Sequence, residues 1–123
     1  MHQCFAYFKA QDPAINQLRH KIRYAIDENN PALVALWLSM EESINDSSVA
    51  SHWQLYCAQY KLLIDVLSDD LLPKHWRMHC LDNIYIPLSS LRRIANNEMH
   101  RQQLSMFYHE LRVISHYFQN SLS

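Results

Sequence analysis

Apolar and polar positions in the first part of the chain recur at the three- and four-residue intervals of amphipathic helices. Asp12-Pro13 is a helix-start signal, because aspartate caps a helix N-terminus and proline is tolerated at the first helical position. The apolar stripe that follows consists of Ile15, Leu18, Ile22, Ala25 and Ile26. It predicts a first helix that ends near Asn29, preceded at residues 1–11 by a short packed arm without a clear period.

Asn30-Pro31 repeats the same start signal and predicts a second helix, antiparallel to the first after a very short connection. The apolar residues expected on its inner face are Leu33, Leu36, Trp37, Met40 and Ile44. After a polar break at residues 45–48, a third stripe keeps the helical spacing for nearly three heptads. Its members are Val49, Trp53, Tyr56, Tyr60, Leu63 and Leu67, and they predict a third helix.

Proline marks both ends of the fourth predicted helix. Asp69 or Asp70 together with Pro73 starts it, and Pro87 ends or kinks it, because proline lacks the N–H group that continues a helix. Its apolar residues are Trp76, Cys80 and Ile84. From Leu88 onward a strong final stripe predicts one long helix to about residue 120, in preference to two pieces separated at Asn96-Asn97, since asparagine costs little inside a helix.

These stripes predict an all-α fold, a four- or five-helix antiparallel bundle with a long C-terminal helix, in which residues 1–123 form a single domain. Composition agrees, because the chain contains no glycine and 49% of its residues are hydrophobic. Without glycine the chain lacks the usual residue of tight hairpins, and glycine-rich phosphate loops and the G-x-S-x-G nucleophile elbow are excluded. The sequence carries no other catalytic signature, and we expect a protein without catalysis and without a cofactor.

Charge and cysteine content restrict the partners further. Eleven basic residues oppose twelve acidic ones without a long run of either sign, so we expect no nucleic-acid partner. The apolar stretches are too short to span a bilayer and the N-terminus lacks the features of a cleaved signal, so we expect a cytoplasmic protein without a membrane partner. Three cysteines, Cys4, Cys57 and Cys80, form no disulfide-scaffold pattern and suit a reducing compartment.

Eight histidines suggest metal binding as an alternative. His75 and His79 lie four residues apart, so they share a helix face as two zinc ligands would, whereas Cys80 points about 100° away. Trp76 stands where the H-E-x-x-H metalloprotease motif has its glutamate. We favour two surface imidazoles and a buried thiol, with His75 and His79 as the only metal candidates.

Arg93 and His100 are separated by six residues, and this spacing resembles the arginine-to-histidine motif of HEPN-type ribonucleases. Those enzymes are also small, all-helical and often dimeric. The resemblance implies RNA cleavage by these two residues as an alternative function. Ile94 departs from the family pattern, which usually has a polar residue there.

The aromatic content points to protein binding, because tyrosine, tryptophan and methionine are enriched at interface hot spots. On the final helix the aromatic and methionine residues span too wide an arc for one neighbour to cover, although aromatic residues also fill small cores. The residues predicted to contact a partner are Trp76, Met106, Tyr108, Tyr117 and Phe118.

In size, charge and helical pattern the chain resembles bacterial secretion and flagellar export chaperones and small anti-activator proteins, without sharing a motif with them. This resemblance implies a small regulator, adaptor or chaperone. Its expected partner is another protein, or a second copy in a homodimer, and no small-molecule substrate is expected. A ribonuclease, a His/Cys metal-binding module and a toxin-neutralising immunity protein remain the alternatives.

Overall fold

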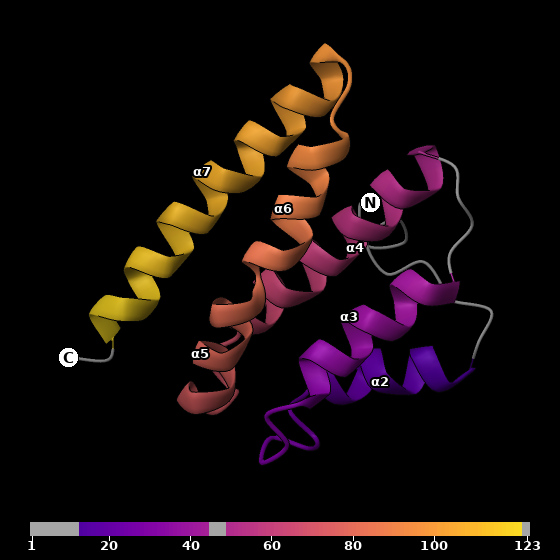
Figure 1. Ribbon diagram of the computed structural model, residues 1–123. Coiled ribbons are helices and arrows are strands. Elements are labelled where there is room, and N and C mark those ends of the chain that lie inside the picture. Colours follow the sequence, from indigo (N-terminus) through magenta and orange to yellow (C-terminus); the bar gives the residue numbers. More distant parts are fainter. Residues whose placement is uncertain (1–12, 45–48, 122–123) are drawn as a thin grey trace.

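The structure of the protein is a computed structural model that describes residues 13–44 and 49–121, and this part of the chain is all-helical (Figure 1). Its helices are α2 (Pro13–Arg23), α3 (Leu33–Ile44), α4 (Val49–Leu67), α5 (Lys74–Asn83), α6 (Tyr85–Ile94) and α7 (Glu98–Ser121). The predicted all-α bundle with a long C-terminal helix is confirmed. The arm expected at residues 1–11 lies outside the described residues.

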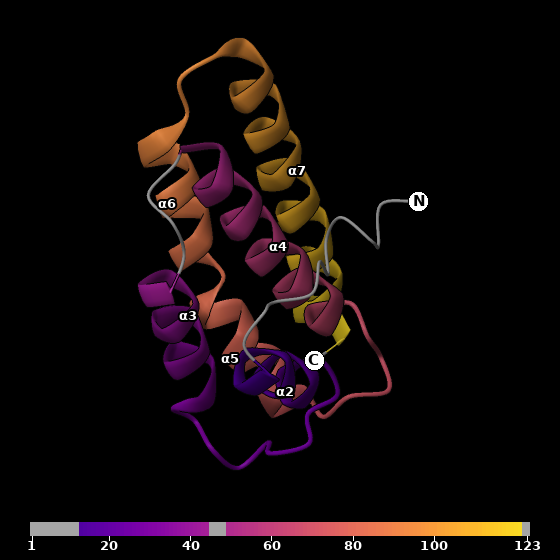
Figure 2. The same cartoon turned by 90° about the vertical axis from the view of Figure 1, so that its right-hand side faces the viewer.

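Helix α4 is the centre of the bundle and contacts α2, α5, α6 and α7 (Figures 1 and 2). Six consecutive residues of α4, from Leu55 to Tyr60, are buried, so every side of this helix faces another part of the protein. A helix that is apolar on all sides belongs in a core. The bounds predicted for it, Val49–Leu67, are confirmed.

Polar side chains within the core connect the first three described helices. Arg19 of α2 forms a buried ion pair with Glu41 of α3. Gln59 Nε2 of α4 donates to Glu41 Oε1 at 3.0 Å. Because an unpaired buried charge is unfavourable, these bonds fix how α2, α3 and α4 meet.

The first helix ends at Arg23, six residues earlier than predicted. The Ile26 N–H donates to the Lys21 carbonyl at 2.9 Å and the Ala25 N–H donates to the Ile22 carbonyl at 3.4 Å, the two bonds of a Schellman motif. This motif needs a left-handed residue, and Ala25 adopts it with φ of 55°. The chain therefore turns away before Ile26, whose side chain is exposed rather than part of the inner stripe.

Helix α3 starts close to the predicted signal, with the Asn30 Oδ1 accepting the Ala32 N–H at 3.2 Å. Its inner face differs from the prediction, because Leu36 is half-exposed. The helix packs against α2 and α5, and this places Val34 and Leu38 in the core instead.

Helices α5 and α6 are separated only by Ile84, which is shared as the end of one and the start of the other. Pro87 explains where the interruption falls. In a continuous helix its ring would clash with the Asn83 carbonyl, and it has no N–H to donate a hydrogen bond to that carbonyl. The prediction that Pro87 ends or kinks this helix is confirmed. α6 then runs antiparallel to α4 (Figure 1).

The single helix predicted from residue 88 to residue 120 is wrong, because α6 ends at Ile94 and α7 begins at Glu98. Asn97 caps α7 by accepting the His100 N–H at its Oδ1 over 2.7 Å. In return His100 Nδ1 accepts the Asn96 N–H at 3.4 Å. The first bond satisfies an N–H of the first turn of α7, and the second holds the backbone of the connecting segment. Together they favour a break that propensity alone does not reveal.

Candidate functional site

The long helix α7 packs against the bundle with only one of its sides. Leu104, Phe107 and Phe118 are buried against the core, and Leu111 and Ile114 are partly buried beside them. The helix packs mainly against α4 and α6, and the Arg77 guanidinium of α5 also lies 4.7 Å from the centre of the Phe118 ring. In Figure 1 the opposite side of α7 faces no other labelled helix, so its outer residues are open to solvent or to a partner.

Four large exposed apolar side chains lie along the flank of α7 that borders α4, and we call them the α7 stripe: Met99, Met106, Val113 and Tyr117. Their exposed fractions are 75%, 69%, 41% and 73%. Met99, Met106 and Val113 are seven residues apart, and Tyr117 follows Met99 by 18 residues, which is about five helical turns. Both separations point side chains in nearly the same direction, so the four form one row. A row of large apolar groups in water is typical of a surface that another molecule covers.

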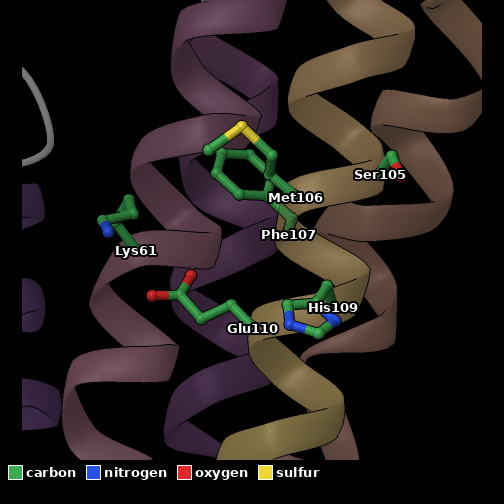
Figure 3. Close-up of a pocket in the computed structure, with 6 residues that line it drawn as sticks. All are labelled: Lys61, Ser105, Met106, Phe107, His109 and Glu110. Atoms are coloured by element: carbon green, nitrogen blue, oxygen red, sulfur yellow. The ribbon is translucent and has the colours of Figure 1, made fainter.

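An open hollow of about 560 Å³ borders the stripe between α7 and α4 (Figure 3). The residues that line it are Lys61, Ser105, Met106, Phe107, His109 and Glu110. Met106 belongs to the stripe, so the hollow and the row of apolar side chains form one surface. The hollow combines an apolar floor with one cation and one anion.

Glu110 is held in place from the α4 side, toward which its side chain extends (Figure 3). Tyr60 Oη lies 2.7 Å from Glu110 Oε1 and 3.0 Å from the Phe107 carbonyl oxygen, and its O–H donates to them. The Tyr60 ring also stacks on Phe107 with 4.2 Å between the ring centroids. Burial, together with the bond to Glu110, raises the pKa of Tyr60, so the phenol stays protonated and keeps donating.

The residues predicted to contact a partner separate into two groups. Met106 and Tyr117 are exposed on the α7 stripe, and Tyr108 is partly buried against the core. Trp76 and Phe118 are only 1% and 2% exposed. Trp76 Nε1 donates to the Ile22 carbonyl at 2.9 Å, which ties α5 to α2. Trp76 and Phe118 are therefore core residues, and their expected place on a binding surface is corrected.

The two histidines considered as metal ligands, His75 and His79, make different contacts. His75 Nε2 lies 3.3 Å from Glu28 Oε1, at the surface. His79 packs beside Trp76 with 5.5 Å between ring centroids, and its Nε2 is buried without a hydrogen-bond partner among the described residues. Across residues 13–44 and 49–121 no three His, Cys, Asp or Glu side chains are arranged to hold a metal ion.

Arg93 lies in the last turn of α6 and His100 in the first turn of α7, on the two sides of the Asn96-Asn97 break. The His100 ring stacks on Trp53 with 3.8 Å between centroids and 13° between planes. Together with the bond from the Asn96 N–H, this contact makes His100 part of the joint between α4, α6 and α7. RNA cleavage by the pair stays a prediction.

Both cysteines of the described helices are reduced and buried. Burial raises the pKa of Cys57 and of Cys80 to about 12, so both thiols are protonated at neutral pH. A protonated, buried thiol is a poor nucleophile and acts as a small apolar side chain. Cys4 lies outside the described residues.

Sequence reasoning did not select Met99, Val113, Lys61 and Glu110. A signal for two of them was present, because Met99 and Val113 lie seven residues before and after Met106. Lys61 and Glu110 carried no such signal, since only the packing of α4 against α7 places them around one hollow.

Comparisons with protein-family models, with curated proteins and with solved structures find no match to this chain. Within the described ranges, no helix has both the length and the apolar character that crossing a bilayer requires.

Proposed function

We propose that this protein is a small cytoplasmic regulator, adaptor or chaperone that binds another protein through the α7 stripe and catalyses no reaction. The observation that carries the proposal is the row of exposed apolar side chains on α7. Solvent exposure of such a row is unfavourable, and covering it with a partner removes apolar area from water.

The shape of the surface favours a helical partner. An amphipathic helix typically docks its apolar residues into a groove through positions spaced by three, four and seven. The stripe residues are separated by seven, seven and four positions, and the hollow beside Met106 provides a recess for one partner side chain. Lys61 and Glu110 at the hollow offer one contact of each charge, which can orient the partner.

Site-specific photo-crosslinking tests this proposal in the full-length chain. A benzophenone amino acid replaces Met106, and in the matched control it replaces Leu71, which is 93% exposed but lies in the loop before α5. We expect discrete crosslinked products, identified by mass spectrometry, from the probe at position 106 and none from the probe at position 71. Equal products from both positions, or none from position 106, would contradict the proposal.

A further inference from the structure

We propose that the α7 stripe is the interface of an antiparallel homodimer, so that its occupant is a second copy of this chain. This inference rests on the binding role proposed for the stripe and names the partner. The reasons are the area that the stripe can bury and the distribution of charges on its two sides.

The stripe supplies more than half of the area that a dimer buries on each partner. A specific interface buries about 800 Å² on each partner. An aromatic side chain presents roughly 150–250 Å² and the other three stripe residues present less, so at their exposed fractions the four together supply roughly 500 Å². The polar residues along the two sides of the stripe can provide the rest, which gives an apolar centre with a polar rim.

The two ends of α7 are complementary when two copies run in opposite directions. Met99 and Tyr117 are 18 residues apart, about five helical turns, so they project in the same direction from opposite ends of the stripe. In an antiparallel pair each Met99 meets the second copy's Tyr117, a sulfur–aromatic contact. A parallel pair would place Met99 against Met99 and Tyr117 against Tyr117.

Hydrogen-bonding groups on the outer side of the stripe favour the same direction. Glu98 and His116 are also 18 residues apart and precede Met99 and Tyr117 by one position each. Both are exposed; Glu98 Oε1 lies 3.4 Å from Arg101 Nε, and His116 Nε2 lies 3.1 Å from Asn120 Nδ2. In an antiparallel pair related by a two-fold axis, the outer side of one stripe meets the outer side of the other, with the two helix ends exchanged. Each Glu98 carboxylate therefore lies near the second copy's His116 imidazole.

The inner side of the stripe carries a second complementary pair. Lys61 and Glu110 line the same hollow, near the middle of the stripe. The same axis turns the hollow of one copy toward the hollow of the other. Each Lys61 then lies beside the second copy's Glu110, and the two contacts are identical by symmetry.

The first experiment measures the mass of the full-length chain by sedimentation equilibrium over a series of concentrations. We expect a dimer that dissociates on dilution. Met106→Glu places a charge in the apolar centre and should raise the dissociation constant about a hundredfold, whereas Leu71→Glu should leave it unchanged. Circular dichroism of each variant checks that it is folded. A wild-type monomer at all concentrations, or a dimer that tolerates Met106→Glu, would overturn the proposal.

The second experiment tests the antiparallel arrangement by exchange of charge. Lys61→Glu alone and Glu110→Lys alone each set like charges against each other and should weaken the dimer at least tenfold. Mixing the two variants restores opposite charges at both contacts, and we expect a heterodimer close to wild-type affinity. A mixture that stays as weak as its components would overturn the arrangement.

The outcomes also separate this inference from the proposed function. A monomer whose position-106 probe crosslinks to a different protein would overturn the homodimer and leave the binding role intact. A Met106-dependent dimer whose probe crosslinks only to a second copy would support the homodimer and remove the support for a separate partner. A probe that crosslinks only within its own chain would overturn both.

Discussion

Helices α4 and α7 are both long and both carry a regular apolar stripe, yet they have opposite positions in the molecule. α4, with 19 residues, is surrounded by other helices, and nearly all of its large side chains are buried. α7, with 24 residues, is covered on one side only and exposes four large apolar residues along the flank beside α4. Apolar spacing defines a helix, while the number of neighbouring helices decides whether its side chains stabilise the fold or remain available for binding.

The largest expected difference between the two helices is in stability. Leu63 of α4 is fully buried, and Leu63→Ala should lower the free energy of unfolding by about 2–5 kcal/mol, because it leaves a cavity in the core. Met106→Ala on α7 should change it by less than about 0.5 kcal/mol. Urea denaturation at low protein concentration, where a dimer contributes least, measures both. Similar losses for the two variants would show that α7 is no less buried than α4.

The next largest difference concerns alkaline pH, which should lower stability through a buried thiol of α4 but not through an exposed thiol on α7. Burial raises the pKa of Cys57 in α4 from 9.0 to about 12, so the unfolded chain loses this proton before the folded protein does. The contribution of the protonated Cys57 thiol to the free energy of unfolding is complete below pH 9. It is lost as pH rises from 9 to 12, by about 1.4 kcal/mol per pH unit. Unfolding measured across this range should show a shallower decline for Cys57→Ala than for wild type. Val113→Cys, an exposed thiol on α7, should add no slope, and parallel curves for wild type and Cys57→Ala would refute the assignment.

Loss of the Tyr60 hydroxyl, which lies between α4 and α7, should have a smaller effect on stability. Tyr60→Phe removes the bonds to Glu110 and to the Phe107 carbonyl and should destabilise the protein by about 1–2 kcal/mol. Tyr117→Phe removes an exposed hydroxyl of the stripe and should leave stability unchanged. Thermal unfolding followed by circular dichroism compares the two. If Tyr60→Phe is also neutral, these bonds do not hold α7 to α4.

The smallest effect concerns the start of α7. Asn97→Ala removes the side-chain cap and should cost about 1 kcal/mol. Asn96→Ala is the matched control, because the Asn96 side chain caps no helical N–H and its loss should cost less. Denaturant titration distinguishes them, and an equal effect of both variants would argue against the capping role of Asn97.

The regular parts of the fold were predictable from the sequence, and the exceptions share a physical cause. The bounds of α4 follow from its unbroken spacing, and Pro87 indicates the end of α5 because a missing N–H acts locally. The break at Asn97 depends instead on side-chain bonds to the backbone of neighbouring residues, and the propensity of asparagine contains no information on whether they form. Leu36 is exposed because of the direction from which other helices approach α3, which the α3 sequence does not encode.

The candidate site likewise combines residues that the sequence indicates with residues that only the packing of helices brings together. Met106 and Tyr117 were predicted from the aromatic and methionine residues of the last helix, and both are exposed. Trp76 and Phe118 satisfied the same criterion but are buried, since a large aromatic residue suits a core and an interface equally well. Lys61 and Glu110 are 49 positions apart in the sequence and become neighbours of one hollow only when α4 and α7 pack together.

The left-handed Ala25 has a consequence for the denatured chain rather than for the native structure. Its backbone conformation is unfavourable by about 1–2 kcal/mol, which glycine would avoid. Glycine would also enlarge the set of conformations open to the unfolded polypeptide and remove a buried methyl group worth about 0.8 kcal/mol. These opposing contributions are of similar size. A glycine-free polypeptide thus begins folding from a narrower ensemble, and the strain at one corner of the bundle offsets part of that entropic advantage.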